Sequence, residues 1–403
     1  MSAPIAVYVH LPWCVRKCPY CDFNSHAAPD RIPEDEYVAA LLADLDADLD
    51  LAGGRTVTSV FLGGGTPSLF RPEAIGRLLA GLAARLPLAP DSEITMEANP
   101  GTVEHGRFAG YAAAGINRVS LGAQSFDAAQ LRALGRIHGP GEIPAAVAEL
   151  RTAGIANFNL DLMYGLPGQA QAGALADVRA AIALEPAHLS HYQLTLEPGT
   201  AFFHRPPVLP DDDRTFEMQH GCQRLLAESG YAQYEVSAYA RPGRECRHNL
   251  NYWRFGDYLG IGAGAHGKVA TAGRIVRTEK VRSPREYLRG AASRATRREV
   301  PGAQLPFEFM LNALRLREGF TEAGFERATG LEPATIAPTL AALAGRGLVE
   351  CDRTAWRASE LGFRFLNEVL TAFLPDPAAP AGARRVVHSG PPARVGEGLS
   401  THC

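Results

Sequence analysis

Residues 7–23 read VYVHLPWCVRKCPYCDF, an apolar, β-branched run followed by three closely spaced cysteines. The apolar run predicts a buried strand, and the cysteines follow where that strand should end in a loop. Cys14, Cys18 and Cys21 have the spacing C-x-x-x-C-x-x-C. Three thiolates this close together can hold a cuboidal iron–sulfur cluster and leave one iron open to a substrate or cofactor.

Two other uses of the three cysteines follow from their chemistry. A structural zinc ion needs four ligands, and His10 or His26 could supply the fourth, so zinc stays open as an alternative. Disulfide bonds would suit a secreted chain, but no charged and then apolar signal segment follows Met1. The other cysteines are scattered singly, at Cys222, Cys246, Cys351 and Cys403. This distribution predicts a chain in the reducing cytoplasm with one special cluster.

The composition is that of an ordinary soluble globular protein. The 403 residues are 46% apolar and 21% charged, with a formal net charge of −3. A chain of this length can bury one large core and a smaller one. No run of 18 apolar residues occurs, which argues against a transmembrane helix. The slightly negative charge provides no basic field, so we expect no nucleic-acid partner.

Strand-like and helix-like segments alternate as far as residue 194. After the run that starts at residue 7, the predicted strands cover 57–62, 93–97, 117–121, 156–162 and 188–194. The predicted helices cover 33–50, 72–86, a segment ending near 114, 127–134, 143–153 and a segment ending at 184. Six strand–helix repeats predict an α/β fold with a parallel sheet. Curled, this sheet is a partial TIM-type (β/α)6 barrel over residues 1–200.

Polar residues and glycines recur where the predicted strands end. The cysteine loop, residues 63–66, Glu97, Gln124 and Asp161 all fall there. Because such barrels carry their chemistry at the carboxyl ends of the strands, we expect a shared site. The glycines would let the backbone approach a ligand, and the carboxylates would accept its hydrogen bonds. Arg136 would either pair with a carboxylate or lie on a solvated face.

The cysteine spacing resembles the signature of radical S-adenosylmethionine (radical SAM) enzymes. The resemblance implies a [4Fe–4S] cluster held by Cys14, Cys18 and Cys21. It also implies that S-adenosylmethionine chelates the fourth iron through its amino and carboxylate groups. The reactivity would belong to the cofactor, while the protein supplies position and electrostatics.

Longer stretches of the chain carry a closer resemblance: HLPWCVRKCPYCDFNSH, FLGGGTPSL, ITMEANPGT, NRVSLGAQSF, LGRIHG and NLDLMYGLPGQ. They resemble the family that contains oxygen-independent coproporphyrinogen III oxidase and a paralogous heme chaperone, over residues 6–374. The resemblance implies that S-adenosylmethionine is contacted by Tyr8, Gly64, Gly65, Thr66, Glu97, Gln124, Arg136 and Asp161. Tyr20, which lies between the second and third cysteines, is a further candidate for cofactor binding.

Two departures from the oxidase pattern favour the chaperone branch. The cysteine pattern of the oxidases is C-x-x-x-C-x-x-C-x-C, whereas this chain has Phe23 at the position of the fourth cysteine. They also carry an N-terminal segment that reaches into their site, and here the first predicted strand begins almost at once. We therefore expect a protein that binds heme and delivers it to apoproteins such as respiratory heme proteins. The alternatives are radical decarboxylation of coproporphyrinogen III propionates and radical chemistry on another substrate.

Residues 201–300 interrupt the alternation and are interpreted as an extension of the barrel. We predict a helix over 211–229, an edge strand over 234–237 and then the motif HNLNYW at 248–253. The motif resembles the H-N-x-x-Y-W sequence of the heme chaperones, which implies that His248 is a candidate heme ligand, with His266 and Cys246 as rivals. A histidine satisfied within an aromatic cluster fits the same pattern. The glycines at 260–267 predict close backbone contacts.

Residues 301–374 predict a mostly helical, winged-helix-like domain. Helices begin at 306, 321 and 333, and a hairpin follows over 348–351 and 355–357. Basic and acidic residues alternate there, so we expect a lid or partner surface and no DNA binding. Residues 375–403 are rich in Pro, Ala, Gly and Arg, which predicts a disordered tail with an inert Cys403.

The partners implied by the resemblance are heme and the apo-heme proteins that receive it. A homodimer, and peripheral membrane association through the recipients, are compatible with the same interpretation.

Overall fold

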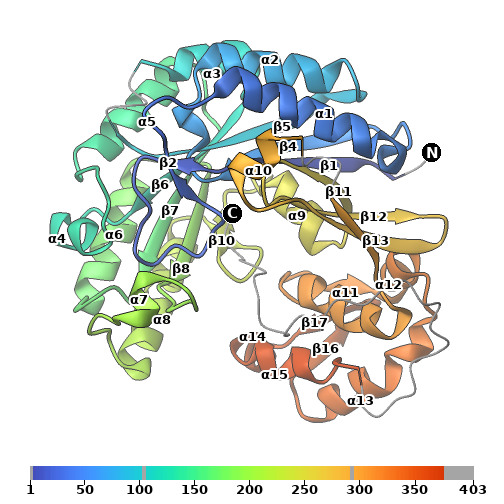
Figure 1. Cartoon of the computed structure of the whole chain (residues 1–403). Helices are drawn as coiled ribbons and strands as arrows, with labels where there is room; N and C mark the ends of the chain where they lie inside the picture. The colour runs from blue at the N-terminus through green and yellow to red at the C-terminus, as the bar shows by residue number, and fades with distance from the viewer. Residues whose placement is uncertain (1–2, 102–105, 291–294, 376–403) are drawn as a thin grey trace. The chain divides into compact units, whose positions relative to one another are not determined.

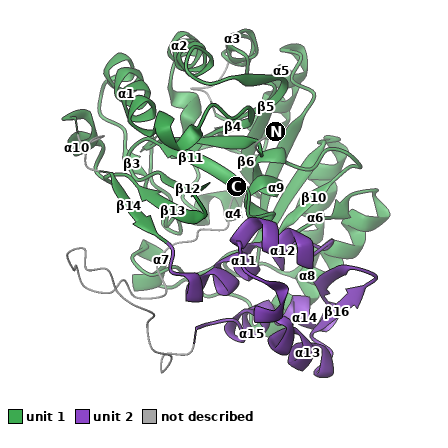
Figure 2. Ribbon diagram, turned by 90° about the vertical axis from the view of Figure 1, so that its right-hand side faces the viewer, with its two compact units in different colours: residues 1–299 green, residues 300–403 purple. Residues whose placement is uncertain are grey.

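The computed structural model describes residues 3–101, 106–290 and 295–375 (Figure 1). It divides into two compact units, Met1–Glu299 and Val300–Cys403 (Figure 2). The predicted tail, from residue 376 on, and Cys403 within it lie outside the described residues. None of the described helices combines the length and the apolar character needed to cross a membrane.

Unit 1 is built on a 12-stranded sheet whose centre is a parallel barrel. Its six strands follow the order of the chain: β1 (Ile5–Leu11), β4 (Val57–Gly64), β5 (Leu88–Ala98), β6 (Arg118–Gln124), β7 (Phe158–Tyr164) and β8 (His188–Gln193). Between them come η1 (Pro67–Leu69), α1 (Glu34–Ala52), α2 (Pro72–Ala83), α3 (Phe108–Ala114), α4 (Ala128–Ala133), α5 (Glu142–Thr152) and α6 (Gln171–Ala183). The α-helices surround the strands (Figure 1), which confirms the predicted partial (β/α)6 barrel.

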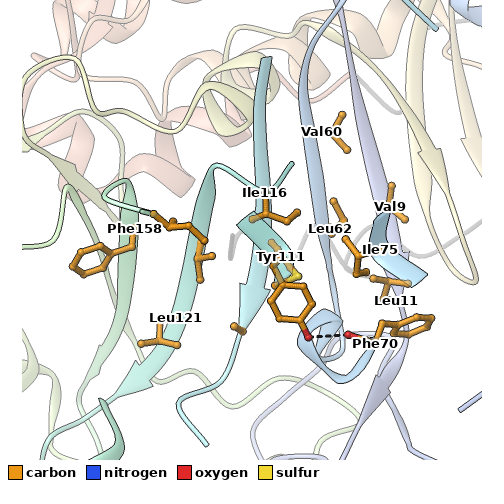
Figure 3. Packing of buried hydrophobic residues seen from close by; sticks show 14 of the residues in the cluster. Val9, Leu11, Val60, Leu62, Phe70, Ile75, Tyr111, Ile116, Leu121 and Phe158 are labelled. Carbon is orange, nitrogen blue, oxygen red and sulfur yellow. Dashed lines mark hydrogen bonds between the residues drawn. The ribbon is translucent and has the colours of Figure 1, made fainter. Parts of the chain in front are cut away.

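One face of these strands forms the hydrophobic core with the helices. Val9, Leu62 and Leu121 lie on the barrel strands β1, β4 and β6 and are completely buried (Figure 3). Tyr111 of α3 joins them, and its hydroxyl donates to the carbonyl of Phe70 at 2.8 Å. Because side chains alternate between the two faces of a strand, the residues between these apolar positions must face into the barrel.

The inner face is polar, and its side chains bond one another across neighbouring strands. Asn159 donates to the hydroxyl of Ser120 at 2.7 Å and lies 2.7 Å from the ring of His188. Ser120 and Ser190 extend the same network to Asp161 and Asn159. A polar lining of this kind suits a barrel whose interior receives polar ligands.

Further strands extend the barrel sheet at both edges, and all of them except β11 pair in antiparallel fashion. On one side β11 (Asp257–Ile261) pairs in parallel with β1 and is followed by β12 (His266–Thr271), β13 (Arg274–Glu279) and β14 (Thr296–Glu299). On the other side β10 (Ala238–Ala240) pairs with β8, and β9 (Ala232–Gln233) pairs with β10. The connecting helices are α7 (Ala201–His204), α8 (Asp212–Glu228), α9 (Arg247–Trp253) and α10 (Pro284–Leu288).

The predicted edge strand at 234–237 is wrong. These residues form the turn between β9 and β10. The carboxylate of Glu235 accepts from both the backbone N–H and the hydroxyl of Ser237 at 3.0 Å, and Tyr234 N–H donates to the carbonyl of Ala238. A side chain that bonds the backbone two residues ahead competes with strand pairing and stabilises a turn.

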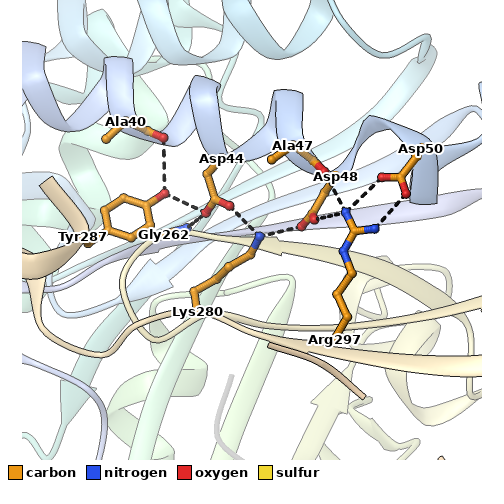
Figure 4. Close-up of polar contacts among 9 residues, drawn as sticks. All are labelled: Ala40, Asp44, Ala47, Asp48, Asp50, Gly262, Lys280, Tyr287 and Arg297. Carbon is orange, nitrogen blue, oxygen red and sulfur yellow. Dashed lines mark hydrogen bonds and ion pairs between the residues drawn. The ribbon is translucent and has the colours of Figure 1, made fainter. Parts of the chain in front are cut away.

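A buried ionic cluster fastens the β11–β13 extension to α1 (Figure 4). The ammonium of Lys280, which is 2% exposed, lies 2.5 Å from Asp44 and 2.6 Å from Asp48. Asp44 also accepts from the N–H of Gly262 at 3.0 Å and from the hydroxyl of Tyr287 at 2.7 Å. Each buried charge is therefore both paired and hydrogen-bonded, which a charge needs when it leaves water.

Unit 2 has the element order of a winged helix. After η3 (Gly302–Gln304) come α11 (Leu305–Ala313), β15 (Phe320–Thr321), α12 (Glu322–Thr329), η4 (Pro333–Thr335), α13 (Ala337–Gly345), β16 (Val349–Asp352), β17 (Ala355–Ala358), α14 (Glu360–Arg364) and α15 (Leu366–Thr371). The three strands form one sheet in the order β15-β17-β16. The predicted winged-helix-like fold, with a hairpin after its helices, is thus confirmed.

Candidate functional site

The three cysteines lie on a loop that leaves the end of β1. At the base of this loop β2 (Trp13–Cys14) and β3 (His26–Ala27) pair in parallel, and Ala28 N–H donates to the carbonyl of Cys14 at 2.8 Å. All three thiols are free and half-buried. The loop is therefore fixed at its base while its sulfur atoms stay within reach of solvent.

Each of the three sulfur atoms has at least one polar neighbour. Thr66 Oγ1 lies 3.5 Å from Cys14, Arg136 Nη1 lies 3.8 Å from Cys18, and Ser25 Oγ lies 3.8 Å from Cys21. Burial raises the pKa of Cys14 and raises that of Cys21 to about 11, so a metal would have to displace these thiol protons. Three soft sulfur ligands surrounded by hydrogen-bond donors fit an iron–sulfur cluster, whose potential such donors tune.

The zinc alternative gains no support from the described residues. Among them, no three His, Cys, Asp or Glu side chains are grouped so that they could hold a metal ion. His10 contacts the hydroxyl of Tyr8 and the carbonyl of Asn24, each at 3.0 Å, and His26 lies 3.3 Å from the Asn24 side chain. A cuboidal cluster has a different requirement, because each thiolate binds its own iron and the sulfur atoms need not converge on one point.

The glycines at the end of β4 approach other parts of the chain closely, and their contact with a ligand stays a prediction. Gly64 has a φ of +112°, and a Cβ there would lie 2.4 Å from the His10 ring. A Cβ on Gly65 would lie 2.6 Å from the carbonyl oxygen of Trp13. The N–H of Thr66 donates to the same carbonyl at 2.8 Å. The glycines thus let the end of β4 clamp the start of the cysteine loop.

Thr66 and Arg136 are linked through Asn99, a residue that the sequence reading missed. Asn99 Nδ2 donates to Thr66 Oγ1 at 3.0 Å. Arg136 Nη2 donates to Asn99 Oδ1 and to the carbonyl of Gly122, the latter at 2.6 Å. Asn99 follows Glu97 by two residues, so the strand period was the signal that could have found it.

Arg136 does not lie on a solvated face. It is half-buried among the strand ends beside Cys18. No carboxylate of the described residues pairs with it, so pairing with a ligand carboxylate stays a prediction. The positive charge of Arg136 next to the Cys18 sulfur would favour an anionic cluster at the same place.

Glu97 and Asp161 bring two carboxyl groups to the inner face near the barrel mouth. Glu97 Oε2 accepts from Gly64 N–H at 3.0 Å. Burial, assisted by the nearby charge of Asp161, raises the pKa of Glu97 to about 8. Asp161 accepts from Ser120 at 3.1 Å and from Asn159 at 2.7 Å, and burial raises its pKa as well. Two carboxyl groups that repel each other in this way are prepared for a cationic ligand.

The remaining S-adenosylmethionine candidates differ in their surroundings. Gln124, at the end of β6, has a φ of +67° and accepts from the hydroxyl of Tyr192 at 2.9 Å. Left-handed backbone at a residue other than glycine is costly and is concentrated at functional sites. Tyr8 lies deeper, in the middle of β1, whereas Tyr20 packs beside Phe202 at a ring distance of 6.5 Å.

His248 lies at the opposite end of the barrel, among aromatic rings. It is 0% exposed, its Nδ1 is 3.1 Å from the hydroxyl of Ser59, and its ring stacks on Phe61 at 5.1 Å. Tyr252 contacts the ring edge-on at 4.9 Å. Burial lowers the pKa of His248 to about 3, which keeps the imidazole neutral. The ring therefore lies in an aromatic cluster as the alternative expected, but it is not fully satisfied there, because its buried Nε2 has no hydrogen-bond partner among the described residues. Heme ligation by His248 stays a prediction.

Two sequence families match the chain. Residues 8–177 match the radical SAM superfamily, and residues 300–365 match the HemN C-terminal domain. Among solved structures, the chain resembles coproporphyrinogen III oxidase (HemN) from Escherichia coli, a radical SAM enzyme, with a TM-score of 0.77. The likeness covers 92% of this chain and 90% of that one at 23% identity, and it supports the fold.

Curated relatives are similar over nearly the whole chain. Heme chaperone HemW of Escherichia coli (strain K12) is 53% identical over 373 residues, which are 92% of this chain and 98% of the relative. Heme chaperone HemW of Haemophilus influenzae is 48% identical over 376 residues, with the same shares. A relative from Bos taurus, radical S-adenosyl methionine domain-containing protein 1, mitochondrial, is 34% identical and shares 93% of this chain and 88% of its own. The chain therefore belongs to the HemW family of radical SAM proteins.

Proposed function

We propose that this chain is a heme chaperone, which binds heme and delivers it to apoproteins such as respiratory heme proteins. The similarity to the HemW proteins carries the proposal, since relatives at 53% and 48% identity are both named heme chaperones and both matches cover 92% of this chain. The radical SAM fold implies a [4Fe–4S] cluster and S-adenosylmethionine beside the heme.

In this proposal the cysteine loop holds the cluster through Cys14, Cys18 and Cys21. The cluster and S-adenosylmethionine together supply one-electron reduction of a sulfonium when both are bound. The protein contributes the thiolates, the hydrogen bonds to them and the charge of Arg136 beside Cys18.

S-adenosylmethionine is assigned to the polar residues of the barrel mouth. Glu97 and Asp161 are placed to neutralise its positive charge, and Gln124 both donates and accepts hydrogen bonds. Because the pKa of Glu97 is about 8, binding a cation next to it would release a proton near neutral pH. The other proposed contacts are Tyr8, Tyr20, Gly64, Gly65, Thr66 and Arg136.

The rival function is decarboxylation of coproporphyrinogen III. The oxidase resemblance requires a fourth cysteine at the position of Phe23. Here that position contributes its carbonyl, which accepts from Ser25 N–H at 2.6 Å and from Lys17 Nζ at 3.0 Å. Residue 23 therefore serves to fold the loop and provides no further sulfur ligand, which favours the chaperone over the oxidase.

Anaerobic measurements on the reconstituted protein separate the two functions. We expect a Soret band that saturates on titration with hemin, and no protoporphyrinogen when coproporphyrinogen III, S-adenosylmethionine and a strong reductant are supplied together. Transfer is measured by mixing the heme-loaded chain with an apoprotein that takes up b-type heme, using free hemin as the reference. Turnover of coproporphyrinogen III without heme binding would replace the chaperone by the oxidase.

The same proposal includes three finer properties: a cytoplasmic location, peripheral membrane association through the recipient apoproteins, and a homodimer. Co-sedimentation with membranes that carry or lack an apo-heme protein tests the association, and analytical ultracentrifugation tests the dimer.

A further inference from the structure

A heme iron needs a ligand that the porphyrin can reach, and the motif around residue 248 does not offer one. His248 and Cys246 are both 0% exposed. Phe61 stacks on the His248 ring, and the Cys246 sulfur lies 3.5 Å from Glu93 Oε1. A porphyrin is much wider than one side chain, so either ligand would become accessible only after α9 had left the end of the barrel.

Three other histidines lie beside the cysteine loop, and they differ in whether their ring nitrogens form hydrogen bonds. His10 is held by the Tyr8 hydroxyl and the Asn24 carbonyl, and His26 contacts the Asn24 side chain. His266 is exposed at the start of β12, and its ring nitrogens form no hydrogen bond to any residue that the structure describes. It is therefore the histidine of this group whose nitrogen is available to iron.

The segment before His266 packs directly on the cysteine loop. Asn24 Nδ2 donates to the carbonyl of Ala263 at 2.9 Å, and a Cβ on Gly264 would lie 2.3 Å from the same nitrogen. The pKa of His10 is lowered to about 4, chiefly by burial and in part by the nearby charges of His26 and His266. The three rings are thus within electrostatic range of one another, at the edge of the candidate cluster site.

Two arginines accompany His266 on the β11–β13 extension. His266 pairs in register with Glu279 of β13, and Arg277 lies two residues before Glu279 on the same face of that strand. His266 is exposed but partly enclosed by its neighbours, and this partial burial lowers its pKa; the charge of Glu279 opposes the shift, and those of Arg277 and Arg282 add to it. Arg277 donates to the hydroxyl of Tyr258 at 3.1 Å. The exposed side chain of Arg282 forms no ion pair with any described residue.

We propose that His266 is the axial ligand of a heme bound on this exposed surface, and that Arg277 and Arg282 pair with its propionates. The inference rests on the proposed heme-binding function and names a site for it. A histidine is a common protein ligand of heme iron, and guanidinium groups bind carboxylates in bidentate fashion. An exposed site also suits delivery, because the heme can leave for another protein without the barrel end having to open.

Hemin titration of the full chain under anaerobic conditions tests the ligand. His266→Ala is compared with the wild type and with His204→Ala, which removes another exposed histidine, on α7. We expect His266→Ala to weaken heme binding by about tenfold or more and to shift the Soret band, while His204→Ala behaves like the wild type. Added imidazole should restore the band in His266→Ala, which a purely structural role would not produce. Equal four-iron absorbance in all three proteins excludes loss of the cluster as the cause.

A second ligand tests the arginines. The double variant Arg277→Gln, Arg282→Gln should lose affinity for hemin and keep its affinity for hemin dimethyl ester, whose propionates carry no charge. An unchanged Soret band and affinity in His266→Ala would overturn the site and leave the chaperone function standing. Failure of the wild type to bind hemin would overturn both, so the two failures are distinguishable.

Discussion

The two ends of the barrel are built from the same strands but treat polar side chains in opposite ways. At the closed end, where the strands begin, His188 and His248 are almost completely buried and contact Asn159 and Ser59, respectively. At the mouth, where the strands end, the three cysteines, Glu97 and Arg136 are only half-buried. Polar groups at the closed end hold the fold together, whereas those at the mouth are the ones that we propose hold the cluster and S-adenosylmethionine.

The charge states of the two ends follow from this difference in burial. Burial lowers the pKa of His248 to about 3 and raises that of Cys246 to about 12, so neither group changes its charge near neutral pH. At the mouth the pKa of Glu97 is raised to about 8, within the range that a ligand or a modest pH change can reach. Variants at each end should therefore fail in different ways.

The largest effect is expected from a mouth residue that binds the cluster and adds little to the fold. Cys14→Ser should abolish the four-iron absorbance and the bound iron, because the cluster would lose one of its three thiolates. The free energy of unfolding without the cluster should change by less than about 1 kcal/mol, since the side chain is half-buried. Cys351→Ser, at an exposed cysteine outside the loop, is the control. Retention of the cluster in Cys14→Ser would contradict the assigned ligand.

The second-largest effect is expected at Lys280, and it tests whether the barrel mouth depends on the ionic cluster that joins the β11–β13 extension to α1. Lys280→Met leaves the buried Asp44 without its cation and Asp48 with Arg297 alone, and it should cost about 3 kcal/mol of the free energy of unfolding. Asp44 also holds Gly262, next to the segment that contacts Asn24, so cluster retention should fall too. Chemical denaturation and iron content provide the two measurements.

The matched control for Lys280 is an exposed ion pair between Arg85, which follows α2, and Asp46, which lies on α1 with Asp44 and Asp48. Arg85 lies 2.6 Å from Asp46, with side chains that are 29% and 48% exposed. Arg85→Met should cost less than about 1 kcal/mol, because solvent screens the pair. Equal losses in the Lys280 and Arg85 variants would mean that the buried cluster is no more important than a surface pair.

A substitution at the closed end should damage the fold and spare the cluster. His248→Ala removes a ring packed between Phe61 and Tyr252 and leaves the hydroxyl of Ser59 without this contact, for a cost of about 2–4 kcal/mol. Thermal denaturation and four-iron absorbance are measured on the same samples, with His204→Ala as the control. Normal stability together with loss of the cluster would reverse the comparison between the two ends.

The smallest effect depends on pH. The pKa of Glu97 is raised in the folded state from 4.5 to about 8, so its contribution to stability is complete below about pH 4.5 and declines as the pH rises toward 8. Glu97→Gln removes this decline and should gain on the order of 1–3 kcal/mol over the wild type by pH 8, with little difference at pH 4.5. Thermal melts of the cluster-free protein across this range, with Glu73→Gln as an exposed control, measure it. A gain that did not change with pH would rule out titration of Glu97 as its source.

Much of the fold and part of the site could be read from local patterns. The alternation of strand-like and helix-like segments predicted the barrel, the positions of the strand ends singled out residues such as Asp161, and the cysteine spacing marked the loop. The turn at 234–237 was missed because Glu235 bonds Ser237, a contact that residue preferences do not reveal. Asn99 was missed because its role comes from two partners distant in sequence, Thr66 and Arg136.

The sequence by itself determined the repeating barrel, the three-sulfur loop and the polar residues at the strand ends, because strand period and residue spacing are local properties of the chain. Only the tertiary structure decided which histidine solvent can reach. His248, the candidate that the motif named, and its rival His266 are 18 positions apart, but α9 buries the first among aromatic rings while β12 exposes the second. Burial depends on the residues that pack against a side chain from elsewhere in the chain, and these contacts exist only in the folded protein.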